Sequence, residues 1–261
     1  PSICGRCRRG YTPESNRDNC ERIGGSKANS MVDSTLLDYC IRDDLKAKAK
    51  VVMAVLDPLK VIIDNYPEDQ VEMLTIENNP ENPELGSREV PFSRELYIER
   101  EDFMEEPVKK FFRLAPGKEV RLKGAYFITC TDVVKDANGN VVEVHCTYDP
   151  ETKSGSGFEG RKVKGTLHWV SAAQAVEATA RLYDYMMLDN PDDPSGEMIM
   201  NPNSLEVKTA FIEPSIQHAK KGDRFQFMRN GYYIVDTKDT TEDHLVFNRI
   251  VPLKSSFKVS K

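Results

Sequence analysis

The sequence predicts a mainly β protein that begins with a helical segment and continues as closed or nearly closed antiparallel barrels. Three observations support this fold class: helical spacing of apolar residues within residues 1–48, many short strand-like runs after them, and a hairpin signal near the middle of the chain. The 261 residues are 39% apolar and 30% charged, which allows two or three compact units. No apolar run approaches the ~18 residues that a membrane helix needs, so no membrane association is expected.

The N-terminal segment contains the signals of two helices. Thr12 can cap the first helix, with a proline at its first position, and Gly24 can end it. Asp33 or Ser34 can start the second, which we expect over residues 35–47 because apolar residues recur there every three to four positions. Such stripes are typical of packing surfaces rather than of a cofactor site.

From residue 51 onward the apolar pattern is that of strands. A helical stripe interrupts it at residues 172–187, and a linker rich in Pro and Asp follows at 190–196. Asn138 and Gly139 predict a two-residue hairpin turn in which both residues take positive φ. A flexible loop rich in Gly and Ser is expected at 153–157. The expected strands are 51–56, 59–64, 71–76, 96–100, 120–122, 125–134, 141–147, 163–170, 205–211, 224–228, 232–236 and 245–251.

The charge distribution allows a nucleic-acid site only if it is local. The net charge of −6 argues against a protein that coats nucleic acid by bulk attraction. Between residues 108 and 124, however, six basic residues accompany a single acid, Glu119, and we call these six the basic stripe. From charge alone, a solvated strand face is an equally good interpretation. The basic stripe consists of Lys109, Lys110, Arg113, Lys118, Arg121 and Lys123.

The cysteines are expected to be reduced thiols in a cytoplasm, because the chain shows no secretory signal. The first residues also lack an initiator Met, and we expect the chain to begin inside a longer protein. A tetrahedral zinc site would need four ligands. Cys4 and Cys7 have Cys-x2-Cys spacing, but Cys20 and Cys40 do not form the second such knuckle that makes the signal strong. No metal site is therefore expected, although an independent enzyme or zinc protein stays open as an alternative. The four thiols in question are Cys4, Cys7, Cys20 and Cys40.

Several blocks of the sequence resemble class I glutaminyl-tRNA synthetases, in collinear order over essentially the whole chain. Shorter blocks lie at residues 53–58, 117–122, 160–165, 181–184, 225–227, 231–232 and 246–249. Many blocks in order are far more specific than one motif. The longest block reads Gly165-Thr166-Leu167-His168-Trp169-Val170-Ser171-Ala172-Ala173.

The resemblance implies the anticodon-binding architecture of that family. A helical connector would occupy residues 1–48, and a proximal β-barrel would combine residues 49–107 with 189–261. A distal β-barrel with a helical return would be inserted between them at residues 108–188. This arrangement agrees with the helical and strand-like patterns of the sequence.

The resemblance also implies a function in protein synthesis. The parent protein would be a glutamine-tRNA ligase that charges tRNA(Gln) with glutamine, using ATP and Mg. The family's catalytic HIGH and KMSKS motifs do not occur in this sequence, so we expect no catalytic residue, no cofactor and no activity in the chain alone. The expected partners are tRNA(Gln) and the catalytic domain of the same polypeptide, with the protein acting as a cytoplasmic monomer.

By resemblance, two of the three anticodon bases would be read from the basic stripe. Arg113 matches the position that contacts the third base, guanine, whereas Arg121 and Lys123 match those for the first. Lys123 stands where the family is known to have arginine, which exchanges a planar fork for a point charge. Lys110 and Phe112 are further candidate tRNA contacts. Without the resemblance, Arg113 and Arg121 would be interpreted as solvated strand residues.

By the same resemblance, the middle base, uracil, would be read by residues outside the basic stripe. Gln226 and Arg229 match two of the three positions that bind it in the family. Val51 stands at the third, where an arginine is expected, and the adjacent Lys50 is a candidate substitute. Such recognition requires unstacked loop bases that present their Watson-Crick edges.

Two points stay open from the sequence. Arg161, Lys162 and Lys164 can meet phosphates, although a solvated face is at least as good an interpretation. A ribosomal-RNA-binding protein of the same barrel fold is the alternative function. The presence of two barrels, the connector and the Gln226/Arg229 pair argue against it.

Overall fold

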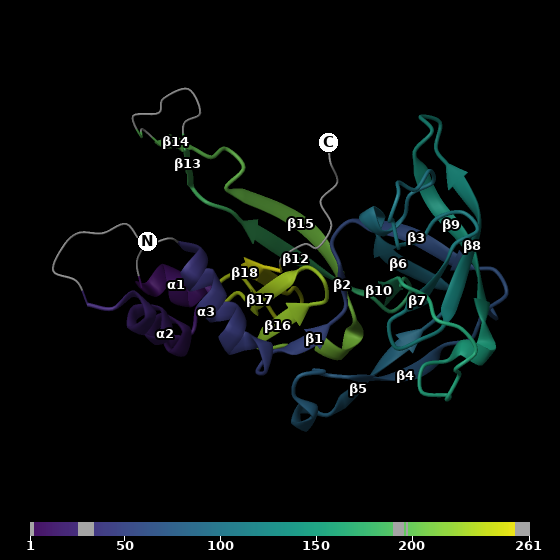
Figure 1. Cartoon of the computed structure of the whole chain (residues 1–261), viewed down its shortest axis with the longest axis horizontal. Coiled ribbons are helices and arrows are strands. Elements are labelled where there is room, and N and C mark those ends of the chain that lie inside the picture. The colour runs from purple at the N-terminus through teal and green to yellow at the C-terminus, as the bar shows by residue number, and fades with distance from the viewer. Residues whose placement is uncertain (1–2, 26–33, 190–195, 197, 254–261) are drawn as a thin grey trace. The chain divides into compact units, whose positions relative to one another are not determined.

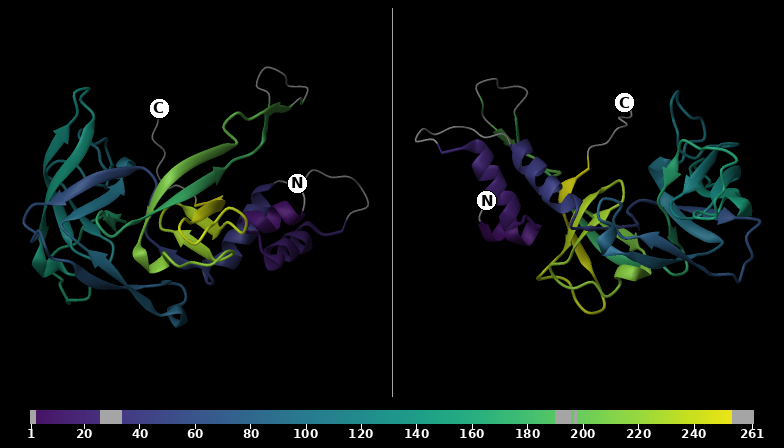
Figure 2. Two further views of the ribbon diagram at one scale, coloured as in Figure 1. Left: turned by 180° about the vertical axis from the view of Figure 1, so that it is seen from behind. Right: turned by 60° about the horizontal axis from the view of Figure 1, so that its bottom comes forward.

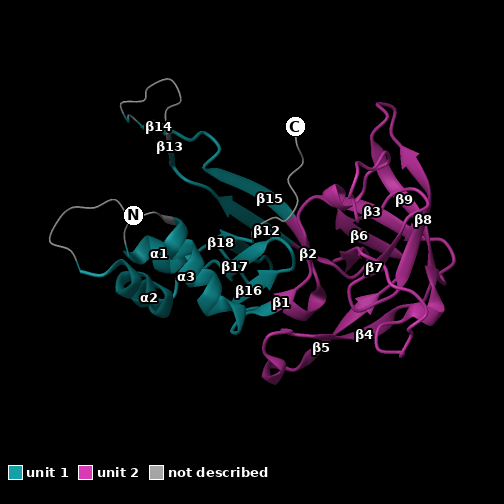
Figure 3. Cartoon of the chain, viewed as in Figure 1, with its two compact units in different colours: residues 1–50, 178–209, 219–261 teal, residues 51–177, 210–218 magenta. Residues whose placement is uncertain are grey.

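The computed structural model describes residues 3–25, 34–189, 196 and 198–253, and it divides the chain into two compact units (Figures 1 and 3). Unit 1 consists of Pro1–Lys50, Ala178–Thr209 and Ala219–Lys261, and unit 2 consists of Val51–Glu177 and Ala210–His218. Both units are therefore built from separate pieces of the sequence. The predicted boundaries of the connector, the proximal barrel and the distal barrel differ from those of the two units. The predicted division therefore stays a prediction.

The N-terminal segment of unit 1 is helical, as predicted. The Thr12 side chain accepts a hydrogen bond from the Ser15 amide at 3.1 Å, and the chain leaves the helix at Gly24, whose φ is 73°. Asp33, one candidate start of the next helix, lies outside the described residues. A short additional helix precedes these two and was not predicted, because it has no apolar stripe. The helices are α1 (Ile3–Arg9), α2 (Pro13–Ile23) and α3 (Ser34–Lys46).

The sheet of unit 1 has the strand order β16-β17-β18-β12-β15. The β16–β17 and β17–β18 pairs are antiparallel and the β18–β12 pair is parallel. Figure 2 shows β12 and β15 as two long neighbouring strands. The strands are β12 (Val176–Tyr183), β15 (Leu205–Ile212), β16 (Arg224–Phe227), β17 (Gly231–Val235) and β18 (Val246–Pro252). Helices and strands share a core of Tyr11, Ile41, Leu45, Ala49, Tyr232, Ile234, Ile250 and Val251.

The helix predicted over residues 172–187 is wrong, because this segment forms strand β12. Along β12 the buried residues are Ala178, Ala180 and Leu182, so the side chains alternate with the period of two that a strand requires. The apparent helical stripe of Ala175, Thr179, Leu182 and Met186 has helical spacing, but only Thr179 and Leu182 belong to β12. The linker predicted at 190–196 lies outside the described residues except for Gly196. On either side of it, β13 (Met187–Asp189) and β14 (Met198–Met200) form an antiparallel ribbon.

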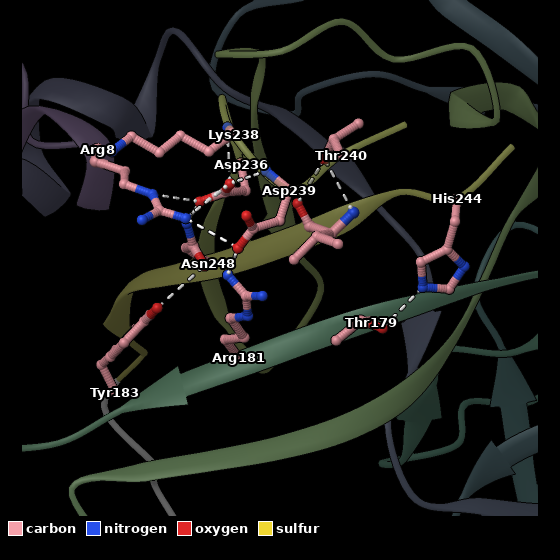
Figure 4. A network of polar contacts seen from close by, with 11 residues as sticks. Arg8, Thr179, Arg181, Tyr183, Asp236, Lys238, Asp239, Thr240, His244 and Asn248 are labelled. Atoms are coloured by element: carbon pink, nitrogen blue, oxygen red, sulfur yellow. Dashed lines mark hydrogen bonds and ion pairs between the residues drawn. The ribbon is translucent and has the colours of Figure 1, made fainter. Parts of the chain in front are cut away.

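A network of polar contacts ties α1 to the strands of unit 1 (Figure 4). Arg8 donates from Nε and Nη2 to the two carboxylate oxygens of Asp236, at 2.9 and 3.1 Å. Asp239 accepts from Arg8 at 3.0 Å and from Arg181 at 2.7 Å. Asn248 donates to Asp236 at 2.5 Å. Both carboxylates of this network are therefore surrounded by donors.

Unit 2 contains a sheet of order β10-β7-β8-β9-β3-β6-β11. The β3–β9 and β7–β10 pairs are parallel. The barrel was predicted to be antiparallel, and these two pairs are exceptions to that prediction. A two-stranded sheet of β4 and β5 accompanies it, and β2 pairs with the end of β15. The strands are β1 (Lys50–Val52), β2 (Ala54–Val55), β3 (Pro58–Ile63), β4 (Glu72–Glu77), β5 (Ser87–Phe92), β6 (Glu95–Glu99), β7 (Glu119–Leu122), β8 (Phe127–Lys135), β9 (Val141–Asp149), β10 (Thr166–Leu167) and β11 (Val170–Ser171).

The two edges of the unit 2 sheet lie close together. β10 and β11 stand at opposite ends of the strand order, yet only His168 and Trp169 separate them in the sequence. Three extended residue steps span at most roughly 11 Å, so the sheet must curl until its edges nearly meet. Trp169 is fully buried inside this curl and donates from Nε1 to the carbonyl of Lys123 at 3.0 Å. The prediction of a mainly β chain with two curled, nearly closed sheets is confirmed.

The hairpin predicted at Asn138 and Gly139 is present between β8 and β9, but its turn is of another kind. Only Gly139 has positive φ, at 84°, and Asp136 N donates to Asn140 O at 2.9 Å across a three-residue loop. The Asp136 carboxylate accepts from the amides of Asn138 and Asn140, at 2.8 and 2.9 Å. This side chain therefore stabilises the longer loop, which needs a single left-handed residue.

Candidate nucleic-acid interface

The outer side of β7 carries the centre of the basic stripe. Val120 and Leu122 point into the core, so Glu119 and Arg121 face the opposite side, and Lys123 follows the strand directly. β7 lies between β8 and β10 in the sheet. The alternation of the strand thus places basic side chains of the stripe outside the barrel, where a ligand can reach them.

Arg121 is the basic stripe residue with the most unusual environment. Its side chain is half-buried, and its guanidinium carbon lies 4.3 Å from the centre of the Phe127 ring. Nη1 donates to Ser154 Oγ at 2.9 Å, and no carboxylate within the described ranges forms an ion pair with this side chain. Burial lowers the pKa of Arg121 from its ordinary value. A partly desolvated cation without an acidic partner favours a ligand that brings hydrogen-bond acceptors.

Arg121 lines an open cleft of about 640 Å³ on unit 2. This volume lies in the range typical of small-molecule sites. The cleft combines aromatic surface with basic side chains, which is the composition of sites that hold unstacked bases. Besides Arg121, the lining residues are Phe127, Phe158, Glu159, Arg161, Lys162 and Val163.

Arg161, on the same cleft, is held by acids. Its Nε and Nη2 donate to the two oxygens of Glu119 at 2.8 and 2.5 Å, and Nη2 also donates to Asp149 at 2.8 Å. These hydrogen bonds to Glu119 and Asp149 raise the pKa of Arg161 above its ordinary value. Glu119, the single acid within the basic stripe, therefore pairs with Arg161 rather than with a stripe residue.

Arg113 is likewise bound to acids. Its Nε lies 3.3 Å from Oδ1 of Asp102, which is fully buried, and its Nη1 donates to the Glu101 carbonyl at 3.1 Å. The Glu101 carboxylate lies 3.3 Å from Nη1. Arg113 is thus oriented by the protein.

The other predicted unit 2 contacts are more exposed. Lys123 Nζ lies 3.3 Å from the carboxylate of Glu77. Phe112 is 49% exposed, and Lys164 Nζ stands 4.9 Å from the centre of its ring. Lys164, proposed from the sequence as a phosphate contact, therefore covers part of an aromatic side chain. Lys110 is exposed and has φ of 69°.

The predicted middle-base residues belong to unit 1. Gln226 faces outward from β16 between buried Phe225 and Phe227, as the alternation predicted. Phe227 pairs with Gly231, so a three-residue loop separates β16 from β17, and its central Arg229 has φ of 64°. In unit 2, Val51 is only 8% exposed and packs as an apolar residue.

Two predicted contacts share an uncommon backbone conformation. Lys110 and Arg229 are the non-glycine residues with positive φ among the described part of the chain. Such conformations cost free energy and are found preferentially at functional sites. Both residues thus stand out by a property that is independent of any motif.

The cysteines of the zinc alternative do not converge. Cys4, Cys7 and Cys20 are exposed on α1 and α2, whereas Cys40 is buried on α3. Over the residues that the structure describes, there is no group of three or more His, Cys, Asp or Glu side chains placed to hold a metal ion. None of the described helices has the length and apolar character needed to cross a bilayer.

Sequence reasoning missed Phe158 as a lining residue of the cleft and Ser154 as the hydrogen-bond partner of Arg121. Ser154 and Phe158 lie in and beside the loop at 153–157, where the Ser154 amide donates to the Ala125 carbonyl at 2.8 Å. The available signal was a single aromatic residue after a run of Gly and Ser, three positions before the basic residues that begin at Arg161. A partly exposed aromatic beside basic residues is typical of single-strand binding.

Two parts of the chain match models of a known protein family. Residues 49–149 and residues 166–236 each match a family model described as tRNA synthetases class I (E and Q), anti-codon binding domain. The chain is 60% identical to the glutamine–tRNA ligase of Clostridioides difficile over 265 residues, which is 100% of this chain and 48% of that protein. It is 57% identical to that of Clostridium perfringens, over 99% of this chain and 48% of that protein. It is 50% identical to the glutamine–tRNA ligase of Nitrosomonas europaea, over 98% of this chain and 47% of that protein. The chain thus spans about half the length of these curated relatives.

Proposed function

The chain belongs to the anticodon-binding region of the class I glutaminyl-tRNA synthetases, and from this premise we propose that it binds the anticodon loop of tRNA(Gln). The proposal rests chiefly on the environment of Arg121. This half-buried cation has no acidic partner among the described residues and lies beside an aromatic cleft. An unstacked base supplies both an aromatic face and carbonyl acceptors. The first anticodon base occupies this cleft.

The remaining predicted contacts extend the same mode of recognition. Arg113, oriented by Asp102 and Glu101, contacts the third base, and Lys123 assists Arg121 at the first. Arginine suits this task because its planar fork offers paired donors, and each good pair discriminates between bases by about 1 to 3 kcal/mol.

The middle base is contacted by Gln226 and Arg229. The strained backbone of Arg229 and the outward direction of Gln226 support this assignment. Buried Val51 contributes no donor, so the middle base has fewer charged contacts than the family pattern implies. Lys50, Lys110 and Phe112 are exposed and contribute further tRNA contacts, with Lys50 next to the position of the missing arginine.

The activity of the whole protein is the ligation of glutamine to tRNA(Gln). ATP and Mg serve the catalytic domain of the longer polypeptide, which works as a cytoplasmic monomer. The present chain supplies recognition, because it contains neither a HIGH nor a KMSKS motif. Alone, it binds tRNA without charging it.

Filter binding at one fixed salt concentration tests the proposal. The chain is titrated against tRNA(Gln) and against transcripts that carry a substituted first, second or third anticodon base. We expect each substitution at the first or third base to weaken binding about 5- to 150-fold, the equivalent of 1 to 3 kcal/mol. Equal affinity for all the transcripts would overturn anticodon recognition. A fixed salt concentration matters because phosphate contacts make the affinity strongly salt-dependent.

A further inference from the structure

The cleft beside Arg121 has an aromatic wall, and the anticodon assignment gives none of the side chains in this wall a role of its own. Phe158 lies between the loop at 153–157 and Arg161, and it lines the cleft together with Arg121. Its ring meets that of buried Phe127 nearly perpendicularly, with ring centres 5.9 Å apart and an angle of 85°. Phe158 is itself only half-buried, so part of its ring surface faces the cleft. An aromatic side chain fixed from behind and open in front is suited to stacking.

Arg161 holds this ring in place. Its guanidinium carbon lies 5.5 Å from the centre of the Phe158 ring and 5.3 Å from that of Phe127. Glu119 and Asp149 bind the donors of Arg161, so the side chain is already paired with carboxylates. A positioning role for Arg161 therefore fits its surroundings better than the phosphate contact considered from the sequence.

The backbone next to Phe158 also leaves space for the ring. A Cβ atom at Gly160 would come within 2.8 Å of the ring carbon Cζ of Phe158. Only a residue without a side chain permits this close approach without displacing the ring. Three neighbours, Phe127, Gly160 and Arg161, thus define where Phe158 stands.

The charges of the cleft restrict the ligand that this wall can accept. Arg161 is matched by two carboxylates, whereas Arg121, within the described residues, has only the hydroxyl of Ser154 as a hydrogen-bond acceptor. A fitting ligand must offer acceptors to Arg121 and a flat apolar face to Phe158. A nucleobase in a single strand has both properties.

We propose that Phe158 is the stacking platform for the base that Arg121 contacts, an inference that rests on the proposed anticodon binding. Stacking tolerates every base because each has a π-face, whereas the donors of Arg121 distinguish one base from another. The two residues thus divide the work at one nucleotide: Phe158 contributes affinity and Arg121 contributes selectivity.

Binding of anticodon stem-loop RNA by Phe158→Ala tests this division. We expect the affinity to fall about 5- to 150-fold, by a similar factor for all four bases at the first anticodon position. The variant Phe158→Tyr should bind the RNA with nearly the affinity of the wild type, because it keeps the aromatic ring. The variant Phe158→Leu should bind as weakly as Phe158→Ala, because it keeps an apolar contact with Phe127 but has no π-face. Thermal unfolding of each variant identifies a loss of binding that comes from misfolding.

An abasic nucleotide provides the decisive control. With the first anticodon base removed from the RNA, Phe158→Ala should cause no further loss, whereas with the second or third base removed it should cause its full loss. A full loss on the first-position abasic RNA, or no loss on intact RNA, would overturn the platform. These outcomes leave the proposed function standing as long as wild-type protein still discriminates anticodons. Loss of that discrimination in the wild type would instead refute the proposed function.

Discussion

Arginines in two regions of the molecule are used in opposite ways. In unit 1, Arg8 and Arg181 are bound by Asp236 and Asp239, and these contacts connect α1 to the strands (Figure 4). In the unit 2 cleft, Arg121 lies over an aromatic ring with a serine hydroxyl as its acceptor. The role of an arginine in this protein therefore depends on the acceptors around it. Paired arginines hold the fold, whereas Arg121 is prepared for a ligand.

Removing the central acid of the unit 1 network should have the largest effect on stability. Asp236 is fully buried and accepts from Arg8, Asn248 and the amides of Lys238 and Asp239. Asp236→Ala leaves several of these donors unsatisfied, so we expect the free energy of unfolding to fall by about 3 kcal/mol. Urea denaturation measures this change.

The matched control for that experiment is an exposed acid of unit 1. Asp243 is exposed, and its replacement by Ala should change the free energy of unfolding by less than about 0.5 kcal/mol. A loss no larger in Asp236→Ala than in Asp243→Ala would show that the network does not stabilise the fold.

Acid should weaken the same network. Burial alone would raise the pKa of Asp236, but the hydrogen bonds from Arg8, Asp239, Asn248 and Lys238 outweigh it and hold the pKa well below its ordinary value. The carboxylate therefore contributes stability above about pH 4, the range of an unfolded Asp, and loses it as the pH falls toward the folded pKa. Urea denaturation below pH 4 should show a steeper loss for the wild type than for Asp236→Ala. Identical pH profiles would contradict the assignment.

Arg113 tests whether an arginine can belong to both classes. Arg113→Ala leaves the buried carboxylate of Asp102 without this ion pair, so we expect a loss of about 2 kcal/mol in the free energy of unfolding. It should also relax discrimination at the third anticodon base, as filter binding with third-base transcripts measures. Unchanged stability together with unchanged discrimination would remove Arg113 from both roles.

Arg121→Ala should have the smallest effect on stability. The side chain has one hydrogen bond and one aromatic contact, and its guanidinium is partly desolvated at some cost. We expect the free energy of unfolding to change by less than about 1 kcal/mol. Lys135→Ala, on neighbouring β8, removes the same charge from an exposed ion pair with Glu105 and is the control. A large destabilisation by Arg121→Ala would place this residue among the structural arginines.

Local signals in the sequence predicted much of the fold. The cap at Thr12 and the glycine at Gly24 defined α2 because both act within a few residues. The hairpin was located correctly, but the side chain of Asp136 selected a longer loop. The helix predicted over β12 was wrong because the helical spacing of Ala175, Thr179, Leu182 and Met186 was given more weight than the alternation along Val176–Tyr183.

The candidate site was predictable only in part. The basic stripe was visible in the sequence, but the acids that bind its members come from other segments, such as Asp102 for Arg113 and Glu77 for Lys123. Glu119, two residues from Arg121 in the sequence, pairs with distant Arg161 instead. Which arginine keeps its donors for a ligand is therefore a property of tertiary structure.

A double-mutant cycle between Arg121 and the first anticodon base measures whether this side chain reads that base. Wild type and Arg121→Ala are each titrated with tRNA(Gln) and with a first-base variant, at one salt concentration, by filter binding. We predict a coupling energy of about 1 to 3 kcal/mol at the first base and nearly zero at the second and third. A coupling energy near zero at the first base would contradict the claim that Arg121 reads it.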